Sequence, residues 1–259
     1  MDFFNRNFPK FLAESNKHCP FVIIKGHRTG SSFLATHLDS HPEIICLPEI
    51  FHPNRVVLGP DHKVCDKEKL MGWRTSHPVD FIEKVLNGKY SQNIKAVGFK
   101  LLYEDAAGPD RPAWKWMQEN KQLHIIHLIR DNHLAQFLSL RQAMIRGRWN
   151  AKTKVDTNPI RVSLPVEQCE VMFERTDTWI KSMRIRFSSH PYKEVHYDNL
   201  TTDTSNELHH IQKFLGVEPQ KLKSGLNKLN RWSLRESIGN YDVLKKHFHG
   251  TQWEKFFDE

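Results

Sequence analysis

Cysteine is scarce in this sequence of 259 residues, and its four copies lie far apart. They are Cys19, Cys46, Cys65 and Cys169, and no two of them form a CxxC pair. A disulfide framework and a zinc site of ordinary spacing are therefore not expected. Reduced thiols in a cytoplasmic protein are the simplest account of four scattered cysteines.

Long apolar runs are also missing. No run approaches the ~18 residues that would predict a membrane-spanning helix. The first ten residues mix charged side chains with Phe and Asn and lack the apolar core of a secretory signal. We therefore expect no stable membrane insertion and a cytoplasmic location. Hydrophobic residues make up 39% of the chain and charged residues 26%, which suits a folded globular protein and argues against disorder.

The sequence contains no RRM, zinc-finger or helix-turn-helix pattern, so we expect no nucleic-acid partner. Its net charge is nevertheless +8. Such a charge favours anionic partners, among them nucleotides and sulfated or phosphorylated substrates. A surface that is merely basic explains the charge equally well, so the charge alone does not select a function.

Short apolar runs alternate with amphipathic stretches along the chain. The runs that predict strands are residues 21–24, 96–102, 123–129 and 194–197. The stretches that predict helices are residues 31–41, 79–86, 113–120, 132–146, 166–188, 205–215 and 240–248. This alternation predicts an α/β fold with a central parallel sheet flanked by helices.

Three segments lack a clear period. Residues 1–19 are expected to form an N-terminal arm, followed by one domain over residues 20–259. Residues 52–76 and 147–165 are polar or rich in Gly and Pro, and we expect irregular loops there that shape a binding site. We find no internal repeat and no low-complexity segment.

A loop with the sequence GHRTGSS, residues 26–32, lies between the first predicted strand and the first predicted helix. A helix N-terminus presents unpaired N–H groups and a partial positive charge, so it binds anions. The two glycines let the backbone turn tightly and approach a ligand. Arg28 adds a fork of donors suited to phosphate or sulfonate oxygens, and Ser31 and Ser32 add hydroxyls.

The loop lacks the Gly-Lys-Ser/Thr ending of a Walker A sequence, in which Lys binds the β/γ-phosphates and the hydroxyl binds magnesium. Here Ser31 follows Gly30, and the cationic Arg28 precedes that glycine. A triphosphate–magnesium site is thereby disfavoured. The alternative for this loop is an ordinary helix N-terminus with a solvated Arg28.

A second cation and hydroxyl occur at the end of the run over residues 123–129. Arg130 follows this run, at the strand end where open α/β sheets bind ligands, and Ser139 lies in the next predicted helix. Taken alone, the pair is better explained by packing of Ser139 and pairing of Arg130 with Asp131.

Taken together, these units resemble the PAPS-dependent sulfotransferases, in particular the bacterial branch similar to nodulation-factor and trehalose sulfotransferases. PAPS is 3′-phosphoadenosine 5′-phosphosulfate, and PAP is the product without the sulfuryl group. FVIIKGHRTGSSFLATHLDSHPEIICLPEIFHP, residues 21–53, resembles the 5′-phosphosulfate-binding region. HLIRDNHLAQFLSLRQA, residues 127–143, resembles the 3′-phosphate-binding region. VGFKLLYE (97–104), HYDNL (196–200) and FLGV (214–217) are similar in order and spacing.

The resemblance implies a P-loop-like nucleotide-binding fold and a role for each matching residue. Arg28, Thr29, Gly30, Ser31 and Ser32 would hold the 5′-phosphosulfate, Arg130 and Ser139 the 3′-phosphate, and Phe33 and Tyr197 the adenine. The sequence departs from the cytosolic branch of the family, because it has no clear Arg-Lys-Gly near its C-terminus.

Sulfuryl transfer to an alcohol needs a base for the alcohol's proton. Glu49 lies in the apolar segment LPEIF, which is expected to raise its pKa, and a glutamate in a matching segment is the base in relatives of the bacterial branch. His52 is the second candidate, because histidine titrates near neutrality. The resemblance implies that Lys100 contacts the sulfonate or positions the acceptor. The alternatives are that Glu49 only orders its loop and that Lys100 only reaches solvent.

The predicted function is thus transfer of a sulfuryl group from PAPS to a hydroxyl acceptor, a carbohydrate or a small metabolite, without a metal. Two alternatives remain. A small-molecule kinase on a related P-loop fold would bind ATP with magnesium. A non-catalytic nucleotide- or polyanion-binding protein would bind PAP or a heparin-like ligand without turnover.

Overall fold

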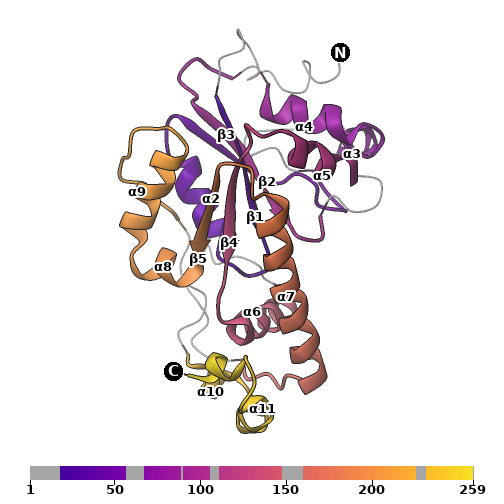
Figure 1. Cartoon of the computed structure of the whole chain (residues 1–259), viewed down its shortest axis with the longest axis vertical. Helices are drawn as coiled ribbons and strands as arrows, with labels where there is room; N and C mark the ends of the chain where they lie inside the picture. The colour runs from indigo at the N-terminus through magenta and orange to yellow at the C-terminus, as the bar shows by residue number, and fades with distance from the viewer. Residues whose placement is uncertain are drawn as a thin grey trace.

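The computed structural model describes residues 18–56, 67–88, 90–105, 111–147, 160–225 and 232–258. These residues form a five-stranded sheet in the order β2-β3-β1-β4-β5, in which every pair of neighbours is parallel (Figure 1). The strands are β1 (Cys19–Lys25), β2 (Ile44–Glu49), β3 (Ala96–Leu102), β4 (His124–Ile129) and β5 (Tyr192–His196).

Helices connect the strands and cover both faces of the sheet. The longer helices are α2 (Ser31–Asp39), α3 (Lys67–Ser76), α4 (Pro78–Leu86), α5 (Arg111–Glu119), α6 (His133–Arg146), α7 (Val166–Arg186), α9 (Thr204–Phe214) and α11 (Tyr241–Phe248). The short ones are α8 (Tyr197–Thr202), α10 (Leu234–Ser237) and the 3₁₀ helix η2 (Glu254–Phe257).

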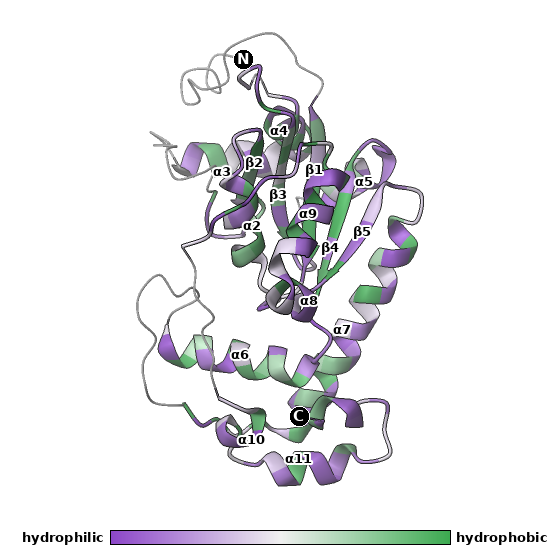
Figure 2. Cartoon of the chain, turned by 90° about the vertical axis from the view of Figure 1, so that its left-hand side faces the viewer, coloured by the Kyte–Doolittle hydropathy of each residue, from purple (hydrophilic) through white to green (hydrophobic). Residues whose placement is uncertain are grey.

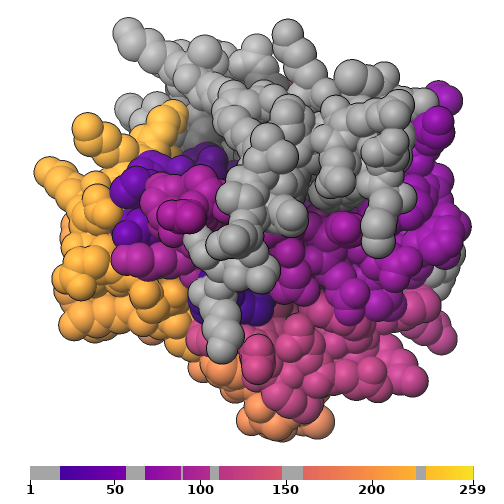
Figure 3. All heavy atoms as spheres, turned by 90° about the horizontal axis from the view of Figure 1, so that it is seen from above, coloured from indigo at the N-terminus to yellow at the C-terminus, as the bar shows by residue number. Residues whose placement is uncertain are grey.

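Alternate residues of the strands supply two cores. In β1, Val22 and Ile24 pack with residues of α4, α5 and the end of α7, whereas Phe21 and Ile23 pack with α2 and α9. Strands buried on both faces are apolar throughout, which is the pattern that predicted the parallel sheet. Figure 3 views the molecule from above and shows the orange α9 segment on one side and the purple and magenta α3–α5 segments on the other.

A third apolar cluster lies beyond the carboxyl end of the sheet. It joins α6 and the first half of α7 to α11 and η2, and its buried aromatic residues include Phe173, Tyr241 and Phe248. Figure 2 shows α6, α10 and α11 as this lower layer, which α7 connects to the sheet. None of the helices in the described part of the chain is long and apolar enough to cross a bilayer.

The four predicted strands and the α/β class are confirmed, but the prediction of irregular structure over residues 52–76 is wrong where α3 occupies Lys67–Ser76. Strand β2 was also missed. It contains Pro48, lies at the sheet edge and changes register between Leu47 and Glu49. Proline has no N–H for the ladder and is tolerated at such edges and bulges.

Two other predicted segments fall largely outside the described residues. Residues 1–17 of the predicted arm are among them, and β1 begins at Cys19, one residue before the predicted domain start. The predicted loop over residues 147–165 is described only at residue 147 and from residue 160 onward, where Val162 makes a parallel bridge with Ile238.

Candidate functional site

The predicted site residues converge because the parallel strands end at one edge of the sheet. Lys25, the last residue of β1, is opposite both Leu102 of β3 and Leu128 of β4. The bulge in β2 brings Glu49 opposite Lys100 of β3. The loop after β1 and Arg130 after β4 therefore meet at the carboxyl edge, where open α/β sheets bind their ligands.

The loop over residues 26–32 ends at the N-terminus of α2. Gly30 is the N-cap of α2, has φ 83°, and no side chain of the described residues caps the helix. A Cβ atom at Gly30 would lie 2.7 Å from Cδ2 of Tyr197, and one at Gly26 would lie 2.9 Å from Nε2 of Gln136. Both glycines thus permit close packing around the loop, and the uncapped N–H groups of α2 are suited to an anion.

Arg28 joins the two predicted phosphate regions. Its Nε donates to Oγ of Ser139 at 3.1 Å, and its carbonyl accepts from Nη1 of Arg130 at 3.2 Å. Burial lowers the pKa of Arg28, and the positive charge of Arg130 lowers it further. Two partly desolvated cations held this close favour an anion between them.

The alternative in which Arg130 pairs with Asp131 is wrong. The carboxylate of Asp131 pairs instead with Nδ1 of His196 at 2.8 Å. Within the described segments Arg130 forms no ion pair, and its guanidinium lies over the ring of Tyr197, 4.5 Å from the centroid. Arg130 thus keeps its charge for another anion.

The remaining predicted donor-binding residues have different surroundings. Thr29 is buried, and its hydroxyl donates to the carbonyl of Gly26 at 3.2 Å, so it supports the loop from within. Ser31 is buried, whereas Ser32 is half-buried and its hydroxyl accepts from Lys100 at 3.4 Å. Phe33 is half-buried against His37, with ring centroids 4.3 Å apart.

Glu49 is held by two buried lysines. Its Oε1 lies 3.0 Å from Nζ of Lys25 and 3.2 Å from Nζ of Lys100. Burial on its own would raise the pKa of Glu49, but Lys25 and Lys100 outweigh it and lower the pKa to about 2. The predicted rise in this pKa is therefore wrong. The segment around Glu49 is apolar, but two lysines from other strands contact its carboxylate.

His52 lies in the turn after β2. Its Nδ1 accepts from the N–H of Asn54 at 3.1 Å, and its carbonyl accepts from the buried Arg74 at 2.9 Å. Burial lowers its pKa, and Arg55 adds to that effect, while the charge of Glu49 opposes it. Its Nδ1 is thus occupied within the turn, which leaves Nε2 as the nitrogen that could exchange a proton.

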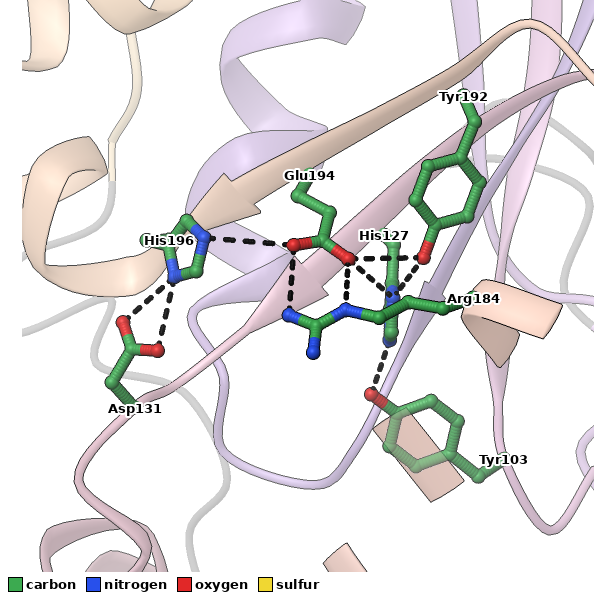
Figure 4. Close-up of polar contacts among 7 residues, drawn as sticks. All are labelled: Tyr103, His127, Asp131, Arg184, Tyr192, Glu194 and His196. Carbon is green, nitrogen blue, oxygen red and sulfur yellow. Dashed lines mark hydrogen bonds and ion pairs between the residues drawn. The ribbon is translucent and has the colours of Figure 1, made fainter. Parts of the chain in front are cut away.

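Sequence reasoning missed a chain of polar contacts that runs from the buried His127 to the exposed Arg184, drawn in Figure 4. The hydroxyl of Tyr103 lies 2.6 Å from Nε2 of His127, and Nδ1 of His127 lies 2.5 Å from the hydroxyl of Tyr192. Tyr192 donates to Glu194 at 3.3 Å, and Glu194 pairs with Arg184 of α7. Since Tyr192 donates onward, it accepts from Nδ1–H, and in a neutral His127 the other ring nitrogen, Nε2, accepts from the hydroxyl of Tyr103.

The pKa of His127 agrees with that assignment, because burial lowers it to about 4. A histidine inside the most strand-like predicted run, residues 123–129, was the one signal for this chain of contacts. Lys25 was missed as well, although a lysine at the end of a buried strand, three residues before Arg28, was a comparable signal. In the described residues no group of three or more His, Cys, Asp or Glu side chains could hold a metal ion.

Comparison with known proteins places this geometry in context. No family model matches the chain. Nodulation protein H from Rhizobium tropici is 27% identical over 248 residues, which cover 92% of this chain and 93% of that protein. Nodulation protein H from Rhizobium meliloti (strain 1021) is 25% identical and covers 92% of this chain and 95% of its own length. The crystal structure of a sulfotransferase from Alicyclobacillus acidocaldarius matches 95% of this chain and 96% of its own, with a TM-score of 0.51 and 16% identity, and it shares the fold.

Proposed function

We propose that this chain is a sulfotransferase that moves a sulfuryl group from PAPS to a hydroxyl acceptor and releases PAP. The observation that carries the proposal is the contact of Arg28 with both Ser139 and Arg130 at the N-terminus of α2. An ordinary nucleotide needs one phosphate site at a helix N-terminus. A nucleotide with separate 3′- and 5′-phosphates needs two adjoining cationic sites, and the loop together with Arg130 supplies them.

Each residue has a task that follows from its position. Arg28 and the N–H groups of α2 neutralise the charge that develops on the 5′-phosphate as it leaves. Arg130 and Ser139 hold the 3′-phosphate. The ring of Tyr197 packs against the guanidinium of Arg130 and orients it. Lys100, which contacts Ser32 of the loop and Glu49, lies where a sulfonate and an acceptor would meet.

Glu49 is our candidate for the base, and His52 remains the alternative. Glu49 is ionised at neutral pH because two ammonium groups stabilise its carboxylate. The surrounding lysines also favour an acceptor that ionises as the new S–O bond forms. A carbohydrate or a small metabolite with a hydroxyl fits this reaction.

The experiment that tests the proposal is thermal unfolding of the purified chain with PAP, AMP or ATP, each with and without magnesium. We expect PAP to raise Tm most, with no requirement for magnesium, because PAP alone fills both cationic sites. Stabilisation by ATP that depends on magnesium would favour the kinase alternative. No stabilisation by PAP would contradict the proposal.

Arg28→Ala provides the matching site test by calorimetry. We expect PAP affinity to fall about tenfold to a hundredfold, because a charged hydrogen-bond partner of the phosphate is lost. Arg111→Ala, which removes an exposed arginine at the start of α5, is the control and should bind PAP normally. Unchanged affinity in Arg28→Ala would disprove the assignment of the loop.

A further inference from the structure

Lys25 is a buried cation for which the fold itself gives no reason. It ends β1, its side chain is 5% exposed, and the only partner of its ammonium in the described residues is Glu49. Burial lowers the pKa of Lys25, and Glu49 opposes that effect. An ammonium taken out of water costs free energy that one ion pair rarely returns. This cost suggests a role in the chemistry of the site.

Both lysines bind the same oxygen of Glu49. Nζ of Lys25 and Nζ of Lys100 lie 3.0 Å and 3.2 Å from Oε1. No neighbouring side chain in the described part of the chain binds Oε2. A carboxylate fixed through one oxygen presents the other in a defined direction, which is what proton transfer in a reactive complex requires.

The two lysines differ in what else they touch. Lys100 also donates to Ser32 of the loop at 3.4 Å, so the donor's sulfonate would compete for it. Lys25 has no such second contact with the loop. It is therefore the partner of Glu49 that stays in place whether or not the donor is bound.

We propose that Lys25 is a positioning residue for the proton-transfer step: its ammonium fixes Oε1 of Glu49 so that Oε2 takes the acceptor's proton. The proposal rests on the proposed function. In this step the O–H bond of the acceptor breaks and its proton passes to Oε2. The acceptor oxygen forms the new S–O bond, and the bond from sulfur to the bridging oxygen breaks. Its electron pair stays on the 5′-phosphate of PAP, and Glu49 later releases the proton to water.

Other titratable groups near Glu49 also bear on its pH dependence. Besides the two lysines they are His52, the carboxyl group of Asp105 and the thiol of Cys46. Lys25 and Lys100 are the side chains that contact the carboxylate directly. Loss of Lys25 should therefore raise the pKa of Glu49 more than loss of His52, Asp105 or Cys46 would change it.

The test compares Lys25→Met with wild type in PAP affinity, kcat and the pH profile of kcat/KM. We expect PAP affinity to hold, kcat to fall about tenfold to a hundredfold, and the acid limb of the profile to move up by about one pH unit or more. The control is Lys95→Met. Lys95 pairs with Glu43 at 2.7 Å beside the start of β3, at the other end of the sheet, and should behave as wild type.

A double-mutant cycle separates positioning from mere structural support. Lys25→Met should cost little further kcat in a Glu49→Gln background, because its effect acts through Glu49. Lys25→Gln replaces Lys25→Met if the latter does not fold, with the same expected profile. A folded Lys25 variant with wild-type kcat and an unmoved acid limb would overturn this proposal and leave the proposed function intact. A wild-type chain that binds PAP but transfers no sulfuryl group would overturn both.

Discussion

Gly30 has a left-handed backbone conformation and also lies in the proposed phosphate-binding loop. Its φ is 83°, and a Cβ atom there would lie 2.7 Å from Cδ2 of Tyr197. Gly216 has a similar φ of 72°, but a Cβ atom there would meet nothing within 4 Å. We predict that Gly30→Ala loses both thermal stability and PAP affinity. Gly216→Ala should lose only about 1 kcal/mol of stability through backbone strain. Calorimetry and thermal unfolding measure the two effects, and equal losses of PAP affinity would contradict the prediction.

Ser139 gives a second prediction at the scale of one residue. Its hydroxyl accepts from Nε of Arg28, so its removal would loosen that guanidinium and delete a donor to the 3′-phosphate. We predict that Ser139→Ala weakens PAP binding about tenfold and AMP binding less, as measured by calorimetry. Ser188→Ala removes an exposed hydroxyl that donates to Ile185 and serves as the control. If Ser139→Ala weakened both nucleotides equally, Ser139 would have no contact with the 3′-phosphate.

Individual elements show what a sequence can and cannot disclose. The predicted bounds of β3 are those observed. A strand buried on both faces is a continuous apolar run, so it can be recognised from the hydrophobicity of its own residues. Strand β2 was missed because Pro48 interrupts its pattern and its pairing depends on β3, more than 40 residues away in the chain. The same bulge brings Glu49 opposite Lys100. The low pKa of Glu49 depends on this pairing between strands and could not be predicted from the residues next to Glu49 in the sequence. The contact between Arg28 and Ser139 likewise requires β1 and β4 to be neighbours.

Strands β4 and β5 are linked by the polar chain through His127, which predicts a pH effect at the scale of elements (Figure 4). Burial lowers the pKa of His127 from 6.5 to about 4, so the unfolded chain binds this proton more readily than the folded one. The folding stability it contributes is present above about pH 6.5 and is lost as pH falls toward 4. The loss amounts to about 3 kcal/mol at most.

Denaturant unfolding between pH 4 and 7 measures this effect. We predict that His127→Gln is less stable than wild type at pH 7 and that its stability falls less steeply on acidification. His247→Gln removes an exposed histidine paired with Glu170 and should keep the wild-type slope. Identical slopes in wild type and His127→Gln would show that His127 does not titrate in this window.

At the scale of the whole molecule, the chain is a five-stranded parallel α/β protein in which four cationic side chains, Lys25, Arg28, Lys100 and Arg130, lie at the carboxyl edge of the sheet. The α/β fold predicted from ordered motifs is confirmed, and a sulfotransferase crystal structure shares it. The relatives named Nodulation protein H are similar to this chain over nearly its whole length. Identity of the acceptor was not encoded in any of those motifs, because the segments that differ most among proteins of one fold are the loops.

The most direct measurement of the central claim is transfer of ³⁵S from labelled PAPS to a panel of carbohydrate and small hydroxyl-bearing acceptors, with PAP quantified in parallel. We predict that wild type moves label to an acceptor with equimolar release of PAP and without magnesium. Glu49→Gln should bind PAP normally and transfer label about 10²-fold to 10⁴-fold more slowly. Absence of label transfer by a wild-type chain that binds PAP would contradict the account.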